Sequence, residues 1–326
     1  MLAQSLREAD AKVQKEKEGL FSEQSKALQH MEGYAMGDLE RKIRLFHEVF
    51  PKLSRFEKMD WEENFLVEFT HDSTSIEGNT LTLIETKMIL IDAIVPVETT
   101  LRELDEVRGH ADAWQFVKDC VKGNVPLSEN IIKDIHERVI PARGVGGIYR
   151  DVPVYIRGAR HVPPHPHKVW DAMKNFAHRM EHDTFTDPIE KAAWIHATFV
   201  KIHPFQDGNG RTARLMMNYH LLANDFPPTS IKLKDREEYF SALEEYAMQD
   251  SLTSFSSLLH KNMEREMNAF LSMYAQHIDL HQLRRNSPAL APLANAYLQD
   301  SGLIDAAPAS NAADDDLLRK KKMLLE

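Results

Sequence analysis

Hydrophobic positions recur every three or four residues along most of the chain, as they do on the buried face of an amphipathic helix. The segments with this spacing are 43–53, 61–69, 83–95, 101–121, 129–140, 167–180 and 189–200. No internal repeat accompanies the pattern. It predicts a mainly α protein.

One segment has a different pattern. Residues 150–163 (RDVPVYIRGARHVP) alternate between apolar and polar positions around a central Arg-Gly pair. Valine, tyrosine and isoleucine on both sides of such a pair are typical of a short β-hairpin. We therefore expect a surface hairpin that acts as a lid or a docking edge.

Composition limits the classes of protein. The chain has 326 residues, of which 43% are hydrophobic, and a formal net charge of −10. It can bury one large core or two ordinary ones, and its negative charge disfavours a nucleic-acid partner. It has no apolar run long enough to cross a membrane and no signal peptide at its start. We expect a soluble cytoplasmic protein without a nucleic-acid or membrane partner.

Cysteine and histidine give no sign of a structural metal. Cys120 is the only cysteine, which excludes an intramolecular disulfide and a thiolate zinc site. Of the sixteen histidines, neither the pair His165 and His167 nor the pair His196 and His203 has the spacing of a zinc hydrolase. His136 is interpreted as a helix-packing residue.

Residues 203–214 (HPFQDGNGRTAR) concentrate charge and bare backbone at the start of a predicted helix. Pro204 ends the preceding helix, and Asp207–Gly210 form a tight loop before helical spacing resumes. Glycine amides at a helix N-terminus suit an anion, and phosphate is the obvious one. Arg211 and Arg214 stand three residues apart in the first turn, so both can reach the same polyphosphate.

Asp207 is a carboxylate beside this predicted phosphate site, where it would be repelled unless a cation lay between them. Mg²⁺ takes one or two carboxylates together with phosphate oxygens and water, so Asp207 is a candidate ligand. His203 precedes it by four residues. An imidazole with its ordinary pKa of about 6.5 can accept a proton from an attacking hydroxyl near neutral pH.

The same twelve residues satisfy H-x-F-x-[DE]-G-N-G-R-x-x-R, the signature of the Fic family, which the chain resembles over about residues 65–270. The matching positions are His203, Phe205, Asp207, Gly208, Asn209, Gly210, Arg211 and Arg214. The resemblance implies a helical bundle with a β-hairpin flap. It also implies transfer of AMP from ATP to a hydroxyl side chain of a target protein.

The resemblance assigns a role to each motif residue. His203 would take the hydroxyl proton, and Asp207 would bind Mg²⁺. Asn209, with the amides of Gly208 and Gly210, would hold the α- and β-phosphates, and the two arginines would hold the outer ones. The phenylalanine of the motif would anchor the loop in the core.

A second motif precedes the first. Residues 71–80 (HDSTSIEGNT) place Ser73, Glu77 and Gly78 in the order [ST]-x-x-x-E-[GN], which by itself is a helix that ends at a glycine. Beside the first motif it resembles the family's inhibitory helix. Glu77 would then pair with Arg214 in competition with the γ-phosphate. A charge-assisted pair contributes about 1.5–3 kcal/mol, which is enough to inhibit the protein and small enough to be reversible.

On this interpretation the chain has four parts. Residues 1–60 are an N-terminal helical region, 61–95 hold the inhibitory helix and the helix after it, and 96–275 are the catalytic core. Residues 276–326 are a C-terminal extension with a proline, alanine and aspartate-rich composition that predicts partial disorder.

Two further sets of nucleotide or target contacts are expected. The flap residues Val154–Gly158 would hold an extended target segment by strand addition, and Ile156, Arg157 and Gly158 would also contact the nucleotide. Tyr239 and Phe240 would lie at the adenine, although aromatic residues at helical spacing also occur as core.

The sequence therefore predicts a Mg²⁺-dependent protein adenylyltransferase with ATP and a hydroxyl-bearing protein as substrates, and it leaves a homodimer open. One alternative is a de-AMPylase, and another is a family variant that transfers a different phosphate-containing group. A third is a nucleotide-sensing binding module, which the intact His203 disfavours because binding alone needs no base.

Overall fold

The computed structural model describes residues 37–141, 144–156 and 158–304. The chain divides into two compact units, Met1–Arg41 and Lys42–Glu326. Of the first unit only residues 37–41 are described, where Arg41 pairs with Asp38 at 3.2 Å. The remaining description concerns the second unit.

The described residues form twelve α-helices and no β-strand, so the prediction of a mainly α protein is confirmed. The α-helices are α2 Asp38–Val49, α3 Arg55–Ile76, α4 Leu83–Leu90, α5 Leu101–Lys122, α6 Glu129–Val139, α7 Pro166–His182, α8 Pro188–Ile202, α9 Asn209–Ala223, α10 Arg236–Gln249, α11 Thr253–Met273, α12 Leu280–Asn286 and α13 Ala291–Asp300. Short 3₁₀ helices are η2 Phe50–Lys52, η3 Leu233–Asp235, η4 Ala275–His277 and η5 Pro288–Leu290. None of the helices in these ranges is long and apolar enough to cross a membrane.

Local sequence fixes where α3, α4 and α5 begin. Each starts with a capping box, in which a serine or threonine accepts from the backbone of a glutamate three residues later, and that glutamate accepts in return. The pairs are Ser54 with Glu57, Thr82 with Glu85, and Thr100 with Glu103. The helix that ends in the second motif therefore has a defined start and direction.

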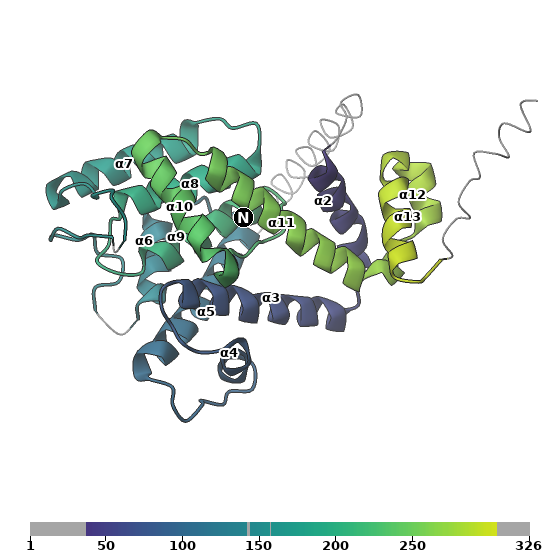
Figure 1. Cartoon of the computed structure of the whole chain (residues 1–326), viewed down its shortest axis with the longest axis horizontal. Coiled ribbons are helices and arrows are strands. Elements are labelled where there is room, and N and C mark those ends of the chain that lie inside the picture. Colours follow the sequence, from purple (N-terminus) through teal and green to yellow (C-terminus); the bar gives the residue numbers. More distant parts are fainter. Residues whose placement is uncertain (1–36, 142–143, 157, 305–326) are drawn as a thin grey trace, which may run out of the picture. The chain divides into compact units, whose positions relative to one another are not determined.

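Helix α9 is the centre of the second unit. It packs against α8, α5, α6 and α3, which surround it in Figure 1. Leu215, Met216, Met217 and Leu221 are fully buried, so the helix presents apolar residues on all sides, as a core helix does. Its first two turns carry the arginines of the 203–214 motif, which are consequently buried in the core.

The predicted β-hairpin is not formed by the described residues of 150–163. They form no strand and turn at Gly158, whose φ is +82°. Two features work against a ladder here. Pro153 has no backbone N–H to donate to a partner strand. The side chain of Arg150 donates to Val152 O at 3.1 Å, so this carbonyl is already occupied. A two-stranded ribbon is marginal by itself in any case.

The start and the end of the chain can be described only in part. Helix α3 runs through the expected boundary at residue 60 without interruption. Beyond residue 276, α12 and α13 are both formed, and they pack on each other. Residues 1–36 of the expected N-terminal helical region and residues 305–326 of the expected C-terminal extension lie outside the described residues.

Candidate active site

The 203–214 motif forms the junction between α8 and α9. His203 ends α8 in the left-handed conformation, with φ +51° and ψ +60°, and its N–H donates to Phe199 O at 2.9 Å. Gly208, with φ +75°, precedes α9. A non-glycine residue with positive φ is uncommon and is often found at functional sites. The loop between these residues places His203 beside the N-terminus of a buried helix.

Asn209 closes this loop on itself. Its side chain is 2% exposed, donates to Phe205 O at 2.9 Å and accepts from Phe205 N at 3.0 Å. Both polar groups of the amide are thus used inside the loop, so in this structure Asn209 shapes the loop at which phosphate is expected to bind. Phe205 is fully buried, as expected of a core anchor, and its ring stacks on His136 at 3.5 Å.

His203 is held as a neutral imidazole. Its Nδ1 lies 3.3 Å from Val200 O, and because a carbonyl can only accept, the Nδ1–H donates and Nε2 keeps its lone pair. Burial lowers the pKa of His203 to about 4, although the hydrogen bond to Val200 and the charge of Glu77 act in the opposite direction. Near neutral pH the ring therefore has an acceptor nitrogen available.

Arg150 and His136 lie outside the 203–214 motif and hold its backbone through hydrogen bonds. Arg150, 3% exposed, donates to the backbone carbonyls of His203 at 2.8 Å and Pro164 at 2.5 Å. His136 donates from Nε2 to Asp207 O at 2.9 Å, while its Nδ1 accepts from Gly147 N at 2.9 Å. His136 is thus the packing residue expected from the sequence and also a support of the loop. Arg150 was not predicted.

Arg214 is fully buried, and each of its three nitrogens has a partner. Nε donates to Ser73 Oγ at 2.8 Å, Nη1 to the Tyr239 hydroxyl at 3.1 Å, and Nη2 to Ser73 O at 2.7 Å and Glu77 Oε1 at 2.9 Å. The structure thus joins the two sequence motifs through one guanidinium. Gly78 follows Glu77 with φ +100°, a conformation that favours glycine and ends α3.

Glu77 lies against the first turn of α9. A Cβ built on Gly210 would come 2.0 Å from Glu77 Oε1, so only glycine leaves room for the carboxylate there. An anion at a helix N-terminus is favoured by the helix dipole. Glu77, whose side chain is 34% exposed, therefore occupies part of the surface where a phosphate would approach.

Arg211 and Asp207 lie together at the start of α9, beside the predicted phosphate site. Asp207 Oδ1 accepts from Gly208 N at 2.7 Å and from Arg211 Nη2 at 3.3 Å. Arg211 is 2% exposed, and its Nε and Nη1 have no hydrogen-bond partner. These two donors point to an anion that would complete the site. Beside them lies a cavity of about 230 Å³.

The donor set fits magnesium better than a metal that needs a protein cage. The described residues contain no group of three or more histidine, cysteine or acidic side chains that could hold an ion. Asp207, with a side chain that is 38% exposed, offers one carboxylate. Mg²⁺ commonly uses one or two carboxylates and takes its other ligands from phosphates and water.

The residues expected at the adenine and in the flap differ in their exposure. Tyr239 is 1% exposed and faces inward, where its hydroxyl bonds to Arg214 and to His196 Nε2 at 3.2 Å, so it cannot stack on a nucleotide. Phe240 is 38% exposed, with the Arg236 guanidinium 4.7 Å from its ring centre. Ile156 is half-buried, Gly158 is exposed, and Arg157 lies outside the described residues.

Comparison with known proteins identifies a family and several relatives. Residues 126–221 match the Fic/DOC family. The chain is 31% identical to a protein adenylyltransferase Fic of Drosophila virilis, over 70% of this chain and 46% of the relative. It is 34% identical to a protein of the same name in Nematostella vectensis, over 62% of this chain and 48% of the relative.

A solved structure agrees with this assignment. Fic-1 (residues 134–508 of that protein) from Caenorhabditis elegans superimposes with a TM-score of 0.62 at 28% identity, covering 72% of each chain. The present chain spans about half the length of the curated relatives it matches. Residues 126–221 of this chain therefore form a domain of the Fic/DOC family.

Proposed function

We propose that this protein transfers AMP from ATP to a hydroxyl side chain of a target protein. The observation that carries the proposal is the α8–α9 junction, where a neutral histidine with a free Nε2 adjoins a helix N-terminus that holds two buried arginines. The names of the relatives, protein adenylyltransferase Fic, support the same reaction.

In the proposed reaction the target hydroxyl oxygen bonds to the α-phosphorus of ATP. The bond from that phosphorus to the oxygen bridging to the β-phosphate breaks, and pyrophosphate leaves. His203 Nε2 accepts the hydroxyl proton. The N-terminal amides of α9 and Arg211 stabilise the charge on the phosphates, and Arg214 would bind the γ-phosphate once Glu77 releases it.

Mg²⁺ would be held by Asp207 together with phosphate oxygens and water. When bound, it would neutralise charge on the phosphates and allow a carboxylate to lie beside them. His136 supports this role of Asp207 by fixing its backbone carbonyl, and Gly208 N fixes one carboxylate oxygen.

Two parts of the chain would contact the target and the adenine. We propose that residues 150–163 act as the flap and acquire a strand partner when an extended target segment binds. Ile156, Arg157 and Gly158 would then face the nucleotide. Phe240, on the exposed side of α10, is the residue suited to contact the adenine ring.

Glu77 would act as an internal inhibitor, since it holds Arg214 and lies on the first turn of α9. The same position favours a second candidate function, the removal of AMP from modified protein. A carboxylate beside the predicted phosphate site can orient a water molecule toward a phosphodiester. The two functions make opposite predictions for replacement of Glu77.

The proposed function is tested by incubating the Glu77→Gly variant with isotopically labelled ATP and a cell lysate. We expect AMP on serine, threonine or tyrosine side chains, identified by mass spectrometry, and its loss when EDTA removes Mg²⁺. Labelled γ-phosphate should remain in solution, because pyrophosphate is the leaving group. Transfer of the γ-phosphate instead would contradict the proposal.

The pH dependence of transfer should reflect the lowered pKa of His203. Because burial holds this pKa at about 4, His203 stays neutral and able to accept a proton well below its usual range. We expect the acid limb of kcat/KM to have its midpoint near pH 4, with little loss of His203-dependent activity down to about pH 5.5. A midpoint near pH 6.5 would show that the base is not a buried histidine.

A further inference from the structure

Glu106 is a buried carboxylate to which the proposed reaction gives no role. It lies on α5, and its side chain is 8% exposed. Oε2 accepts from Asn79 Nδ2 at 3.0 Å, and Oε1 accepts from Arg102 Nε at 2.9 Å. A buried charge is costly unless it is paired and hydrogen-bonded, and these two donors satisfy both oxygens.

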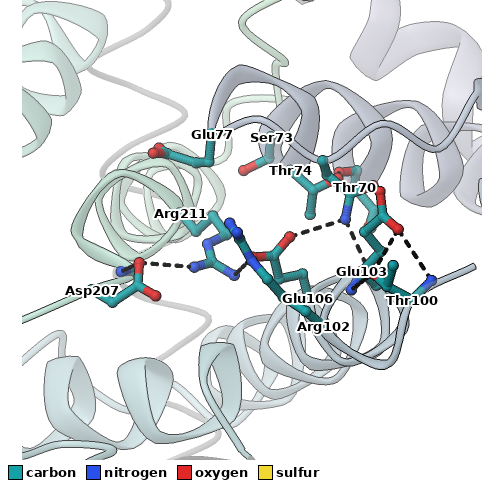
Figure 2. A network of polar contacts seen from close by, with 12 residues as sticks. Thr70, Ser73, Thr74, Glu77, Thr100, Arg102, Glu103, Glu106, Asp207 and Arg211 are labelled. Atoms are coloured by element: carbon teal, nitrogen blue, oxygen red, sulfur yellow. Dashed lines mark hydrogen bonds and ion pairs between the residues drawn. The ribbon is translucent and has the colours of Figure 1, made fainter. Parts of the chain in front are cut away.

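Glu106 also faces the inner arginine of the motif. Glu106 Oε1 lies 4.0 Å from Arg211 Nη1, and Figure 2 shows Arg211 between Asp207 and Glu106. This distance is too long for a hydrogen bond, but the electrostatic attraction persists in a buried setting. Glu106 therefore attracts the guanidinium without occupying its donors, so Nε and Nη1 keep their capacity for another anion.

The contrast with Arg214 defines what Glu106 can do. Glu77 bonds directly to Arg214 and uses one of its donors, as a competitor of phosphate does. Glu106 does not bond to Arg211, from which it lies 4.0 Å away, and it is held in place by a hydrogen bond from Asn79. If Asp207 turns toward Mg²⁺, Glu106 remains as the fixed anion that keeps Arg211 at the wall of the 230 Å³ cavity.

Asn79, which donates to Glu106, lies just after the C-terminal end of α3, the predicted inhibitory helix. Asn79 is 6% exposed and stands two residues after Glu77, and its Nδ2 also lies within hydrogen-bond distance of Glu103 O, at 3.3 Å. Asn79 N donates to Thr74 O at 3.2 Å, which binds this residue to the last turn of α3. The position of Glu106 thus depends on the same segment that places Glu77.

We propose that Glu106 is a positioning residue, which holds Arg211 in the orientation that binds the phosphates of ATP beyond the α-phosphate, and that Asn79 links it to the end of α3. This inference rests on the proposed function. It adds a second link between the two motifs, separate from the pair of Glu77 with Arg214.

The test compares ATP with AMP as ligands of the full chain. In Glu106→Gln the amide oxygen can still accept from Asn79, but the charge beside Arg211 is lost. We expect about tenfold weaker binding of a non-hydrolysable ATP analogue with Mg²⁺, measured by titration calorimetry, with AMP affinity changed less than about twofold. In an Arg211→Ala background, Glu106→Gln should change ATP affinity no further.

Glu103→Gln is the matched control. Glu103 lies on the same helix and accepts from Thr80 and Thr100, so its loss disturbs the adjacent loop and the α5 cap without touching Arg211. We expect a lower melting temperature and an unchanged ratio of ATP to AMP affinity. Should Glu106→Gln fail to fold, Asn79→Ala removes the hydrogen bond to Glu106 and is expected to weaken ATP about threefold with AMP unchanged.

Two results would overturn the inference while leaving the proposed function intact. One is an equal loss of ATP and AMP affinity in Glu106→Gln, and the other is additivity of Glu106→Gln with Arg211→Ala. Either would mean that Glu106 only supports the fold. Absence of nucleotide binding by the unaltered protein and by Glu77→Gly would overturn the proposed function, and this inference with it.

Discussion

Replacement of His203 by alanine is expected to lower AMP transfer by about two to four orders of magnitude, the usual contribution of general base catalysis. ATP binding should stay close to that of the unaltered protein. The Arg211 donors and the α9 amides belong to other residues, and Asn209 holds the loop through Phe205. Transfer is measured with labelled ATP in the Glu77→Gly background, and binding by calorimetry.

Two further variants make this result specific to the imidazole. His203 has φ +51°, so His203→Asn, which tolerates this conformation and lacks a comparable base, separates the loss of chemistry from backbone strain. His220→Ala is the control, because burial lowers the pKa of His220 to about 4 as well, but it lies in the last turn of α9. Transfer at an unchanged rate in both His203 variants would remove His203 from the mechanism.

The helices could be predicted because each depends on local sequence, and the contact between the two motifs could be predicted from the family resemblance. Apolar spacing identified the helices, and capping boxes such as Thr100 with Glu103 fix where three of them begin. The pair of Glu77 with Arg214 could be expected from two short motifs of opposite charge, although 137 residues separate them. The spacing of residues along the chain does not show that the two motifs lie close together, and this was inferred from the family resemblance.

The supports of the site could not be found in the same way. Arg150 reaches His203 across 53 residues and stands in an alternating segment, where its inward direction depends on the packed loop. Glu106 did leave a signal: it stands one helical turn before the buried His110, on the face of α5 that also buries Ala113 and Val117. A charged residue at a core position indicates a buried partner, but the sequence does not say which one.

Tyr239 shows the limit of arguing from neighbouring aromatic residues. Tyr239 and Phe240 are adjacent, and consecutive residues on a helix point in different directions. The packing of α10 on α8 and α11 turns Tyr239 inward, where its hydroxyl meets Arg214, and leaves Phe240 at the surface. Only the tertiary arrangement decides which of the two is core.

Replacement of Glu77 by glycine is expected to raise AMP transfer, to the protein itself or to a target, by about one to two orders of magnitude, as the loss of a charge-assisted pair implies. The change frees one donor of Arg214 and clears the first turn of α9, where Glu77 Oε1 now lies against Gly210. Because only ATP has a γ-phosphate to bind the freed donor of Arg214, affinity should rise more for ATP than for ADP.

Controls separate this effect from a general loosening of α3. Glu63 lies on an exposed face of the same helix and does not contact Arg214. Glu63→Gly should therefore lower the stability of the helix by about 1 kcal/mol and should not activate the protein. Arg214→Ala in the Glu77→Gly background should remove most of the gain, since the freed guanidinium is then missing. The two changes should be strongly non-additive.

The outcome also decides the direction of the reaction. Glu77→Gly leaves His203, Asp207 and Arg211 unchanged, so a protein that adds AMP should gain activity on removal of this one carboxylate. A protein that removes AMP should lose it, because the carboxylate would then position the attacking water. Activity that is unchanged in both directions, or a gain that survives Arg214→Ala in full, would mean that the contact at 2.9 Å does not restrain the enzyme.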